Sequence, residues 1–175
     1  MGFGRSTGRM GRGALLLALL LGPGFAQTAV PIEQLRAAFL YNFALFVYWP
    51  APPTGEFDLC LYGANPAIAT ETLAGKRVGG AALRVRRPAN VSELRGCQVL
   101  YIDGRDRAAL ARAREAVATL PVLTVSEASE FNDRPAMINL IVAQGRIAFD
   151  IDTEAAGRAG IQVSSRLLRL ARKVY

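Results

Sequence analysis

Few of the residue types that carry enzymatic chemistry are available in this chain of 175 residues. It contains no histidine, which excludes a Ser-His-Asp triad and imidazole metal ligands. The turn Gly63-Ala64-Asn65-Pro66, after the first predicted strand, lacks the glycine spacing of a phosphate-binding loop. The sequence therefore predicts no catalytic residue, no metal site and no cofactor, and an enzyme is the least favoured class of function.

Two groups of charged residues nevertheless lie at spacings that suit ions. Asp150, Asp152 and Glu154 stand at alternate positions and could offer carboxylate oxygens to a hard cation. A solvent-facing strand edge that runs into a helix cap explains them better. The second group, residues 103–106 (DGRD), ends a strand ahead of a helix, where open α/β sheets often bind anions. Ordinary turn chemistry explains that group equally well.

The first 26 residues have the features of a secretory signal peptide and are set apart from the fold. Three arginines in the first 12 residues precede an unbroken apolar run at 14–21, and small residues lead up to Ala26. We predict cleavage after Ala26 and a mature domain at 27–175. An uncleaved anchor is the alternative, but the apolar run is far shorter than the ~20 residues that span a bilayer.

The basic residues give little indication of a polyanionic partner. Cleavage after Ala26 would leave 18 basic and 14 acidic residues, a net charge of +4, and export argues against nucleic acid as a partner. Arg84, Arg86 and Arg87 fit a solvent-exposed strand face better than an anion-binding patch.

Cys60 and Cys97 are the only two cysteines, and both remain after cleavage. In an oxidising compartment such a pair normally forms a disulfide. The alternative is two separately buried thiols. A bond would join the first and third predicted strands as neighbours and make a thiolate nucleophile unavailable.

Hydrophobic patterning predicts strands that alternate with helices and then a hairpin. Strands are expected at 57–63, 82–87, 97–103, 121–126, 137–142 and 146–151. Helical segments are expected up to Trp49, at 65–73, near 92–94, and at 105–119, 153–159 and from Ser164 or Ser165 to Val174. This order predicts a single α/β domain, with a mostly parallel sheet, an antiparallel hairpin at its edge and helices on both faces.

The segment RAAFLYNFALFVYWP, at 36–50, carries the strongest functional hint. At 100° per residue one side of the predicted helix is a core face that includes Phe39 and Phe43. Tyr41, Leu45 and Tyr48 fall on the opposite side, where a water-exposed helix would be polar. The helix is too short to span a membrane, so the stripe is either covered by another element or forms an apolar surface for a partner. Both alternatives stay open.

The last predicted helix, from Ser164 or Ser165, is amphipathic and basic. Leu167, Leu170 and Val174 form its apolar stripe, and basic side chains occupy the other positions. Such a helix can lie on an anionic lipid surface, but a terminal helix packed on the sheet is the more common arrangement.

Six blocks resemble the YfiR/HmsC-like family in order and spacing: RAAFLYNFALFVYWP, FDLCLYG, CQVLYID, PVLTVS, MINLIVAQGRIAFDID and AGIQVSSRLLRLA. The resemblance runs from about Ile32 to Ala171. It implies a periplasmic α/β domain that represses an inner-membrane diguanylate cyclase by binding its periplasmic region, which lowers cyclic-di-GMP output and biofilm formation. A cysteine pair in the family matches Cys60 and Cys97.

Three departures from the family pattern bear on this interpretation. A second cysteine pair is missing, so redox control of repression is in doubt. Leu45 and Tyr48 stand where the pattern has Lys and Glu, and residues 134–136 replace a Gly-Gly step. We expect Tyr41, Leu45 and Tyr48 to contact the cyclase or a second copy of the chain. The alternative function is a periplasmic module that binds a small molecule, an anion or a nucleotide, in a pocket by the turns at Gly63 and Gly104.

Overall fold

The computed structural model describes residues 1–4, 30–63, 67–127 and 136–175. Within these ranges the chain forms an eight-stranded sheet in the order β10-β8-β7-β6-β5-β2-β4-β3 and a separate two-stranded sheet of β1 and β9. Three predicted features fall on residues outside the described ranges: residues 5–26 of the signal peptide, the start of the helix at 65–73, and the polar segment after Glu127. No helix of the described chain combines the length and apolar character needed to cross a membrane.

The elements follow one another as strands with intervening helices. The α-helices are α1 (Ile32–Leu45), α2 (Arg107–Val117), α3 (Thr153–Arg158) and α4 (Ser165–Leu168), and the 3₁₀ helices are η1 (Thr70–Leu73) and η2 (Val91–Gly96). The strands are β1 (Val47–Tyr48), β2 (Glu56–Tyr62), β3 (Arg77–Val78), β4 (Ala81–Arg86), β5 (Val99–Ile102), β6 (Leu123–Glu127), β7 (Ile138–Ala143), β8 (Arg146–Ile151), β9 (Gln162–Val163) and β10 (Lys173–Val174).

The pairing of the strands confirms the predicted mixed sheet. Strand β2 lies parallel to both β4 and β5, and β5, β6 and β7 continue the parallel order. The hairpin between β7 and β8 is antiparallel, with Gln144 and Gly145 as its two-residue loop. Both loop residues have positive φ, 51° and 71°, as the tight turns that match strand twist require. The antiparallel pair is followed by β10, which lies parallel to β8 and forms the edge.

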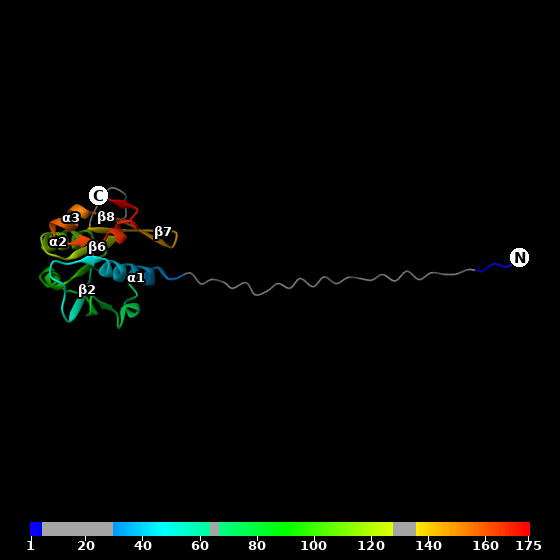
Figure 1. Ribbon diagram of the computed structural model, residues 1–175, viewed down its shortest axis with the longest axis horizontal. Coiled ribbons are helices and arrows are strands. Elements are labelled where there is room, and N and C mark those ends of the chain that lie inside the picture. Colours follow the sequence, from blue (N-terminus) through cyan, green and yellow to red (C-terminus); the bar gives the residue numbers. More distant parts are fainter. Residues whose placement is uncertain (5–29, 64–66, 128–135) are drawn as a thin grey trace.

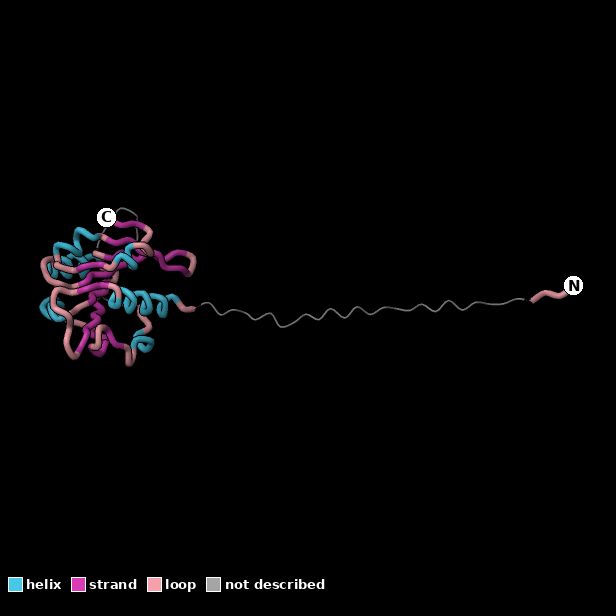
Figure 2. The backbone as a smooth tube through the Cα atoms, in the orientation of Figure 1, coloured by secondary structure: helices cyan, strands magenta, loops and turns pink. Residues whose placement is uncertain are grey.

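Helices cover both faces of the sheet, and each face has its own apolar core. Helix α1 runs across one face near the middle of the sheet (Figure 1), where Leu40 and Phe43 are fully buried. Helices α2 and η2 pack on the other face, and the tube drawing shows helical segments on both sides of the strands (Figure 2). Because side chains alternate along a strand, Leu59 and Leu61 of β2 point to the α1 face and Cys60 points to the α2 face.

The first helix is shorter than predicted. It ends at Leu45 instead of Trp49, and Val47 and Tyr48 pair with β9 in antiparallel register. Two tendencies favour this change: Val47 and Tyr48 prefer extended backbone, and a residue before a proline avoids the helical region. Tyr48 is therefore not on the helical stripe that we expected it to share with Tyr41 and Leu45.

The end of the chain is also different from the prediction. Helix α4 stops at Leu168, and Lys173 and Val174 form β10 parallel to β8. The backbone N–H of Tyr175 donates to the carbonyl of Ile151, and that of Arg172 donates to Phe149. Pairing with β10 satisfies backbone groups on the edge of β8, which a longer terminal helix would leave without strand partners. The predicted basic amphipathic helix up to Val174 therefore does not form.

Candidate functional site

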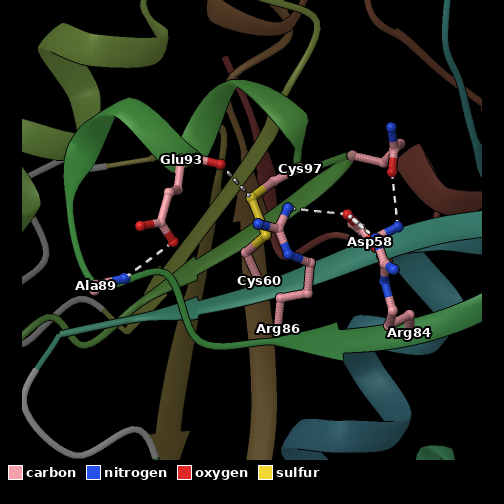
Figure 3. Close-up of a disulfide and its surroundings, with 8 residues drawn as sticks. Asp58, Cys60, Arg84, Arg86, Ala89, Glu93 and Cys97 are labelled. Carbon is pink, nitrogen blue, oxygen red and sulfur yellow. Dashed lines mark hydrogen bonds and ion pairs between the residues drawn. A yellow bond between two sulfur atoms is a disulfide. The ribbon is translucent and has the colours of Figure 1, made fainter.

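The disulfide is formed as predicted and joins neighbouring strands. Cys60 lies in β2, and Cys97 follows η2 just ahead of β5, with 5.8 Å between their Cα atoms (Figure 3). Both residues are buried against Leu94 and α2. Strands β2 and β5 are parallel neighbours, which is the pairing of the first and third predicted strands that the bond required. The described cysteines are therefore bonded and offer no thiol for chemistry.

Beside the disulfide, an ion-pair cluster occupies the same side of β2. Asp58, only 6% exposed, lies opposite Arg84 in the parallel register of β2 and β4. Its carboxylate accepts hydrogen bonds from Arg84 Nε at 2.7 Å and Arg86 Nη1 at 3.0 Å (Figure 3). Arg84 is exposed as predicted and Arg86 is half-buried, but the prediction missed that the carboxylate within β2 binds both side chains.

The electrostatics of Asp58 follow from this geometry. Burial by itself raises the pKa of the carboxyl, but hydrogen bonds from Arg84 and Arg86 and their positive charge outweigh it and lower the pKa below its ordinary value. Charge-assisted bonds of this kind are stronger than neutral ones. The cluster therefore ties β2 to β4 and serves the fold rather than a ligand.

The three carboxylates considered for a cation have separate structural roles. Asp150 accepts from Arg172 Nε at 2.9 Å, Asp152 caps α3 by accepting from the backbone N–H of Ala155, and Glu154 pairs with Arg158 one helical turn later. The cap on α3 confirms the structural interpretation of Asp152. In the described ranges no group of three His, Cys, Asp or Glu side chains is arranged to hold a metal ion.

The three residues predicted to contact a partner differ in exposure. Tyr41 is half-buried: its hydroxyl donates to the carbonyl of Arg77 at 3.0 Å, and Lys76 Nζ lies 4.6 Å from its ring centroid. Tyr41 therefore has partners within the chain, at the first residue of β3 and at the residue before it. Leu45 and Tyr48, in contrast, are exposed by 40% and 59%. Large apolar side chains left in water at the end of a core helix are typical of a contact surface.

A second candidate site is a cavity of about 630 Å³ at the carboxyl ends of β5 and β6. It lies beside the turn that begins at Asp103 and is closed on one side by the first turns of α1, including Arg36. Gly104 is needed there for space, because a Cβ atom would stand 1.9 Å from the carbonyl oxygen of Glu127. Gly63 packs against Asp103, so the structure brings both predicted turns together.

Two ion pairs line this cavity. Arg36 Nε donates to one carboxylate oxygen of Glu127 at 2.8 Å and Nη2 to the other at 3.1 Å. Arg105 makes the same two-point contact with Asp103, at 3.0 and 2.8 Å. The hydrogen bonds and positive charge of Arg105 lower the pKa of Asp103 in spite of burial. The Arg36–Glu127 pair joins α1 to β6 across 91 positions of sequence, a contact that no local pattern could predict.

Comparison with known proteins gives the wider context of this geometry. No curated protein matches the chain. A solved structure, described as a conserved domain protein from Vibrio cholerae O1 biovar El Tor strain N16961, is similar over 83% of this chain with 14% identity and a TM-score of 0.47. The match covers 60% of that protein's chain, so this chain spans less than two thirds of its length.

The sequence also matches a family model, DUF4154, described as YfiR/HmsC-like, over residues 33–172. The matched range begins in the first turn of α1 and ends just before β10. It contains both cysteines, the cavity-lining ion pairs and the exposed residues at the end of α1. The chain therefore belongs to the YfiR/HmsC-like family, a family of periplasmic regulators rather than enzymes.

Proposed function

We propose that the protein is a periplasmic repressor of an inner-membrane diguanylate cyclase and acts by binding the periplasmic region of that enzyme. Repression would lower cyclic-di-GMP output and, with it, biofilm formation. The observation that carries the proposal is the match to a family of periplasmic regulators over residues 33–172. The buried disulfide agrees with an oxidising compartment, and the proposed signal peptide at 1–26 would bring the chain there.

The proposed contact surface is the exposed end of α1 with the strand that follows it. Leu45 and Tyr48 stand in water, whereas the neighbouring Phe43 and Val47 are buried and hold the backbone in place. An aromatic side chain on a rigid support can anchor an interface, because its burial removes a large apolar area from water at a small cost in conformational entropy. Tyr41 would contribute less than expected from sequence, since its hydroxyl and ring already have partners in the chain.

A repression assay in the native host tests this proposal. Tyr48→Ala, introduced into the chromosomal copy, should raise cyclic-di-GMP while the amount of folded protein stays constant. Truncating an aromatic anchor typically costs about 2 kcal/mol, roughly thirtyfold in affinity. The matched control is Tyr175→Ala, the same change at an exposed tyrosine beside the sheet edge, which should leave cyclic-di-GMP unchanged.

Direct binding separates a contact with the cyclase from a contact with a second copy. The purified protein should retain the periplasmic region of a cyclase from the same host in a pull-down, and Tyr48→Ala should weaken this retention. If Tyr48→Ala instead converts a dimer to a monomer and cyclase binding is unaffected, the surface joins two copies. Full repression by Tyr48→Ala together with Leu45→Ala would refute the proposed surface.

The cavity at Gly104 favours a second candidate function, a module that binds a small molecule. Its volume of about 630 Å³ exceeds the ~300 Å³ at which ligand pockets begin. It lies at the carboxyl ends of parallel strands, where open α/β sheets bind ligands. A ligand would raise the melting temperature by mass action, so a thermal-shift screen tests this function independently of repression.

A further inference from the structure

The cavity is lined by a tyrosine whose hydroxyl group can form a hydrogen bond with a ligand. Tyr101, in β5, lines the cavity and is only 3% exposed. Its side chain points to the α1 face, as its membership of that core indicates. Across the described residues, no hydrogen bond joins its hydroxyl to another group, although the charged groups of Arg36 and Glu127 lie close enough to influence it. The Tyr101 side chain therefore offers the cavity a hydroxyl group that no described residue binds.

The hydroxyl keeps its proton over the whole physiological range. Burial, assisted by the negative charge of Glu127, raises the pKa of Tyr101 to about 12. A neutral phenol can donate one hydrogen bond and accept another. A molecule in the cavity that offers an acceptor can therefore receive a hydrogen bond from Tyr101.

The charges of the described residues that line the cavity cancel. Its described lining contains three arginines and three acidic side chains: Arg36, Arg105, Arg107, Glu33, Asp103 and Glu127. Arg36 and Arg105 are each held by two hydrogen bonds to a carboxylate. An anion would meet the negative charge of Glu127 or Asp103 beside each of these arginines, and a cation would meet the positive charge of the arginine beside each carboxylate. A ligand of either net charge therefore meets opposition.

A neutral polar molecule fits this lining. A guanidinium group has five N–H donors and a carboxylate has about four lone pairs, more than the contact between Arg36 and Glu127 uses. Hydroxyl groups of a ligand can therefore accept from Arg36 and donate to Glu127 without separating that pair. A zwitterion has the same balance of charge. Ile32 and Ala67 add an apolar part to the wall.

We propose that this cavity binds a small polar molecule of zero net charge, which accepts a hydrogen bond from the Tyr101 hydroxyl. The proposal rests on the second candidate function and names the class of its ligand. It is independent of the surface at Tyr48, which the repression assay tests separately.

The experiment uses the exported protein and a defined set of probes. Glucose and N-acetylglucosamine represent neutral hydroxylated molecules, glycine betaine represents zwitterions, and inorganic phosphate, citrate and putrescine represent net charge. At least one uncharged or zwitterionic probe should raise the melting temperature with increasing concentration, and the charged probes should not. Comparing the two saccharides with glycine betaine shows whether the cavity prefers a neutral hydroxylated molecule or a zwitterion.

Two matched variants locate the binding. Tyr101→Phe removes only the hydroxyl and should weaken binding of the active probe about three- to tenfold, the usual net effect of one hydrogen bond. The control is Tyr62→Phe, the same change on the neighbouring strand β2 but on the opposite face of the sheet. This variant should bind within about twofold of the unchanged protein.

Each other outcome overturns the proposal in a different way. Equal affinity in Tyr101→Phe and the unchanged protein would place the ligand elsewhere. Tighter binding of phosphate or citrate, with loss in Tyr101→Phe, would overturn the zero-charge class but leave the small-molecule function standing. No response to any probe would overturn both, while the cyclic-di-GMP measurement on Tyr48→Ala would still decide the repressor function.

Discussion

Breaking the Cys60–Cys97 bond should be among the most destabilising changes that leave the native contacts largely in place. The bond closes a loop of 37 positions. In the chain-entropy account such a cross-link restricts the unfolded chain and stabilises the native state by about 4 kcal/mol. A domain of this size is typically stable by only about 5–15 kcal/mol, so the reduced protein should unfold at a much lower concentration of urea.

The assay compares three proteins in urea unfolding followed by circular dichroism. The oxidised protein gives the reference, and the reduced protein retains both sulfur atoms without the cross-link. The double variant Cys60→Ala/Cys97→Ala also removes sulfur atoms that are fully or almost fully buried, so it should lose roughly 1 kcal/mol more than reduction does. The dependence of the unfolding free energy on urea should steepen without the bond, because the unfolded chain expands.

One result would refute the cross-link argument. If reduction lowers the free energy of unfolding by less than about 1 kcal/mol while the double variant loses several, packing of the sulfur atoms and not chain entropy is the source of the stability. A mass spectrum of the untreated protein must first show the bond, since two free thiols would remove the premise.

Three further changes test other parts of the structure. Asp58→Asn should be destabilising at neutral pH and should make the stability of the fold less sensitive to acid. The pKa of Asp58 is lowered in the folded state, so its contribution to stability is complete above the ordinary carboxyl range near 4 and is lost as pH falls through the lower folded value. Urea unfolding between pH 2 and 7 would measure both effects. Gly104→Ala should cost about 1–3 kcal/mol, because its Cβ atom would stand 1.9 Å from the Glu127 carbonyl oxygen; a stability within 0.5 kcal/mol, as is usual for surface changes, would contradict this. Phe43→Ala should cost about 3–5 kcal/mol, since its ring packs edge-on against two phenylalanines at 5.9 and 5.1 Å, and thermal unfolding would measure the loss.

The sequence predicted the parts of the fold that depend on neighbouring residues. Buried parallel strands such as β5 and β6 read as short apolar runs, and the β7–β8 hairpin has its loop residues at the expected positions. Local caps were also readable, because Asp152 precedes the helix whose N–H group it accepts from. These features need no knowledge of the rest of the chain.

The errors arise where a distant segment decides the local structure. The predicted helix to Trp49 gives way to β1 because β9, more than 100 positions later, offers a pairing partner. The predicted last helix gives way to β10 because β8 has a free edge. A helical pattern of apolar residues favours a helix only weakly, and hydrogen bonds to a distant strand can outweigh that preference.

The same limit applies to the candidate sites. The exposed Leu45 and Tyr48 were visible in the sequence as apolar residues on a side expected to be polar, although only the structure shows that Tyr48 follows the helix. The Asp58 cluster had a readable signal, an acidic residue inside an otherwise apolar strand, but its pairing with Arg84 and Arg86 was not predicted. The Arg36–Glu127 pair and the Tyr101 hydroxyl had no local signal, because their neighbours come from separate elements.

The groups that stabilise the fold and the residues proposed to bind a partner or ligand lie on opposite faces of the sheet. The disulfide and the Asp58 cluster lie on the face that α2 and η2 cover, and both connect β2 to a neighbouring part of the sheet. The cavity and the exposed end of α1 belong to the other face, where Arg36 and Leu45 are nine residues apart on one helix, a rise of about 13 Å. Changes on the first face should therefore reduce repression only in proportion to the loss of folded protein. Tyr48→Ala and Tyr101→Phe should alter binding at an unchanged melting temperature, and a shift in stability that parallels every loss of binding would contradict this division.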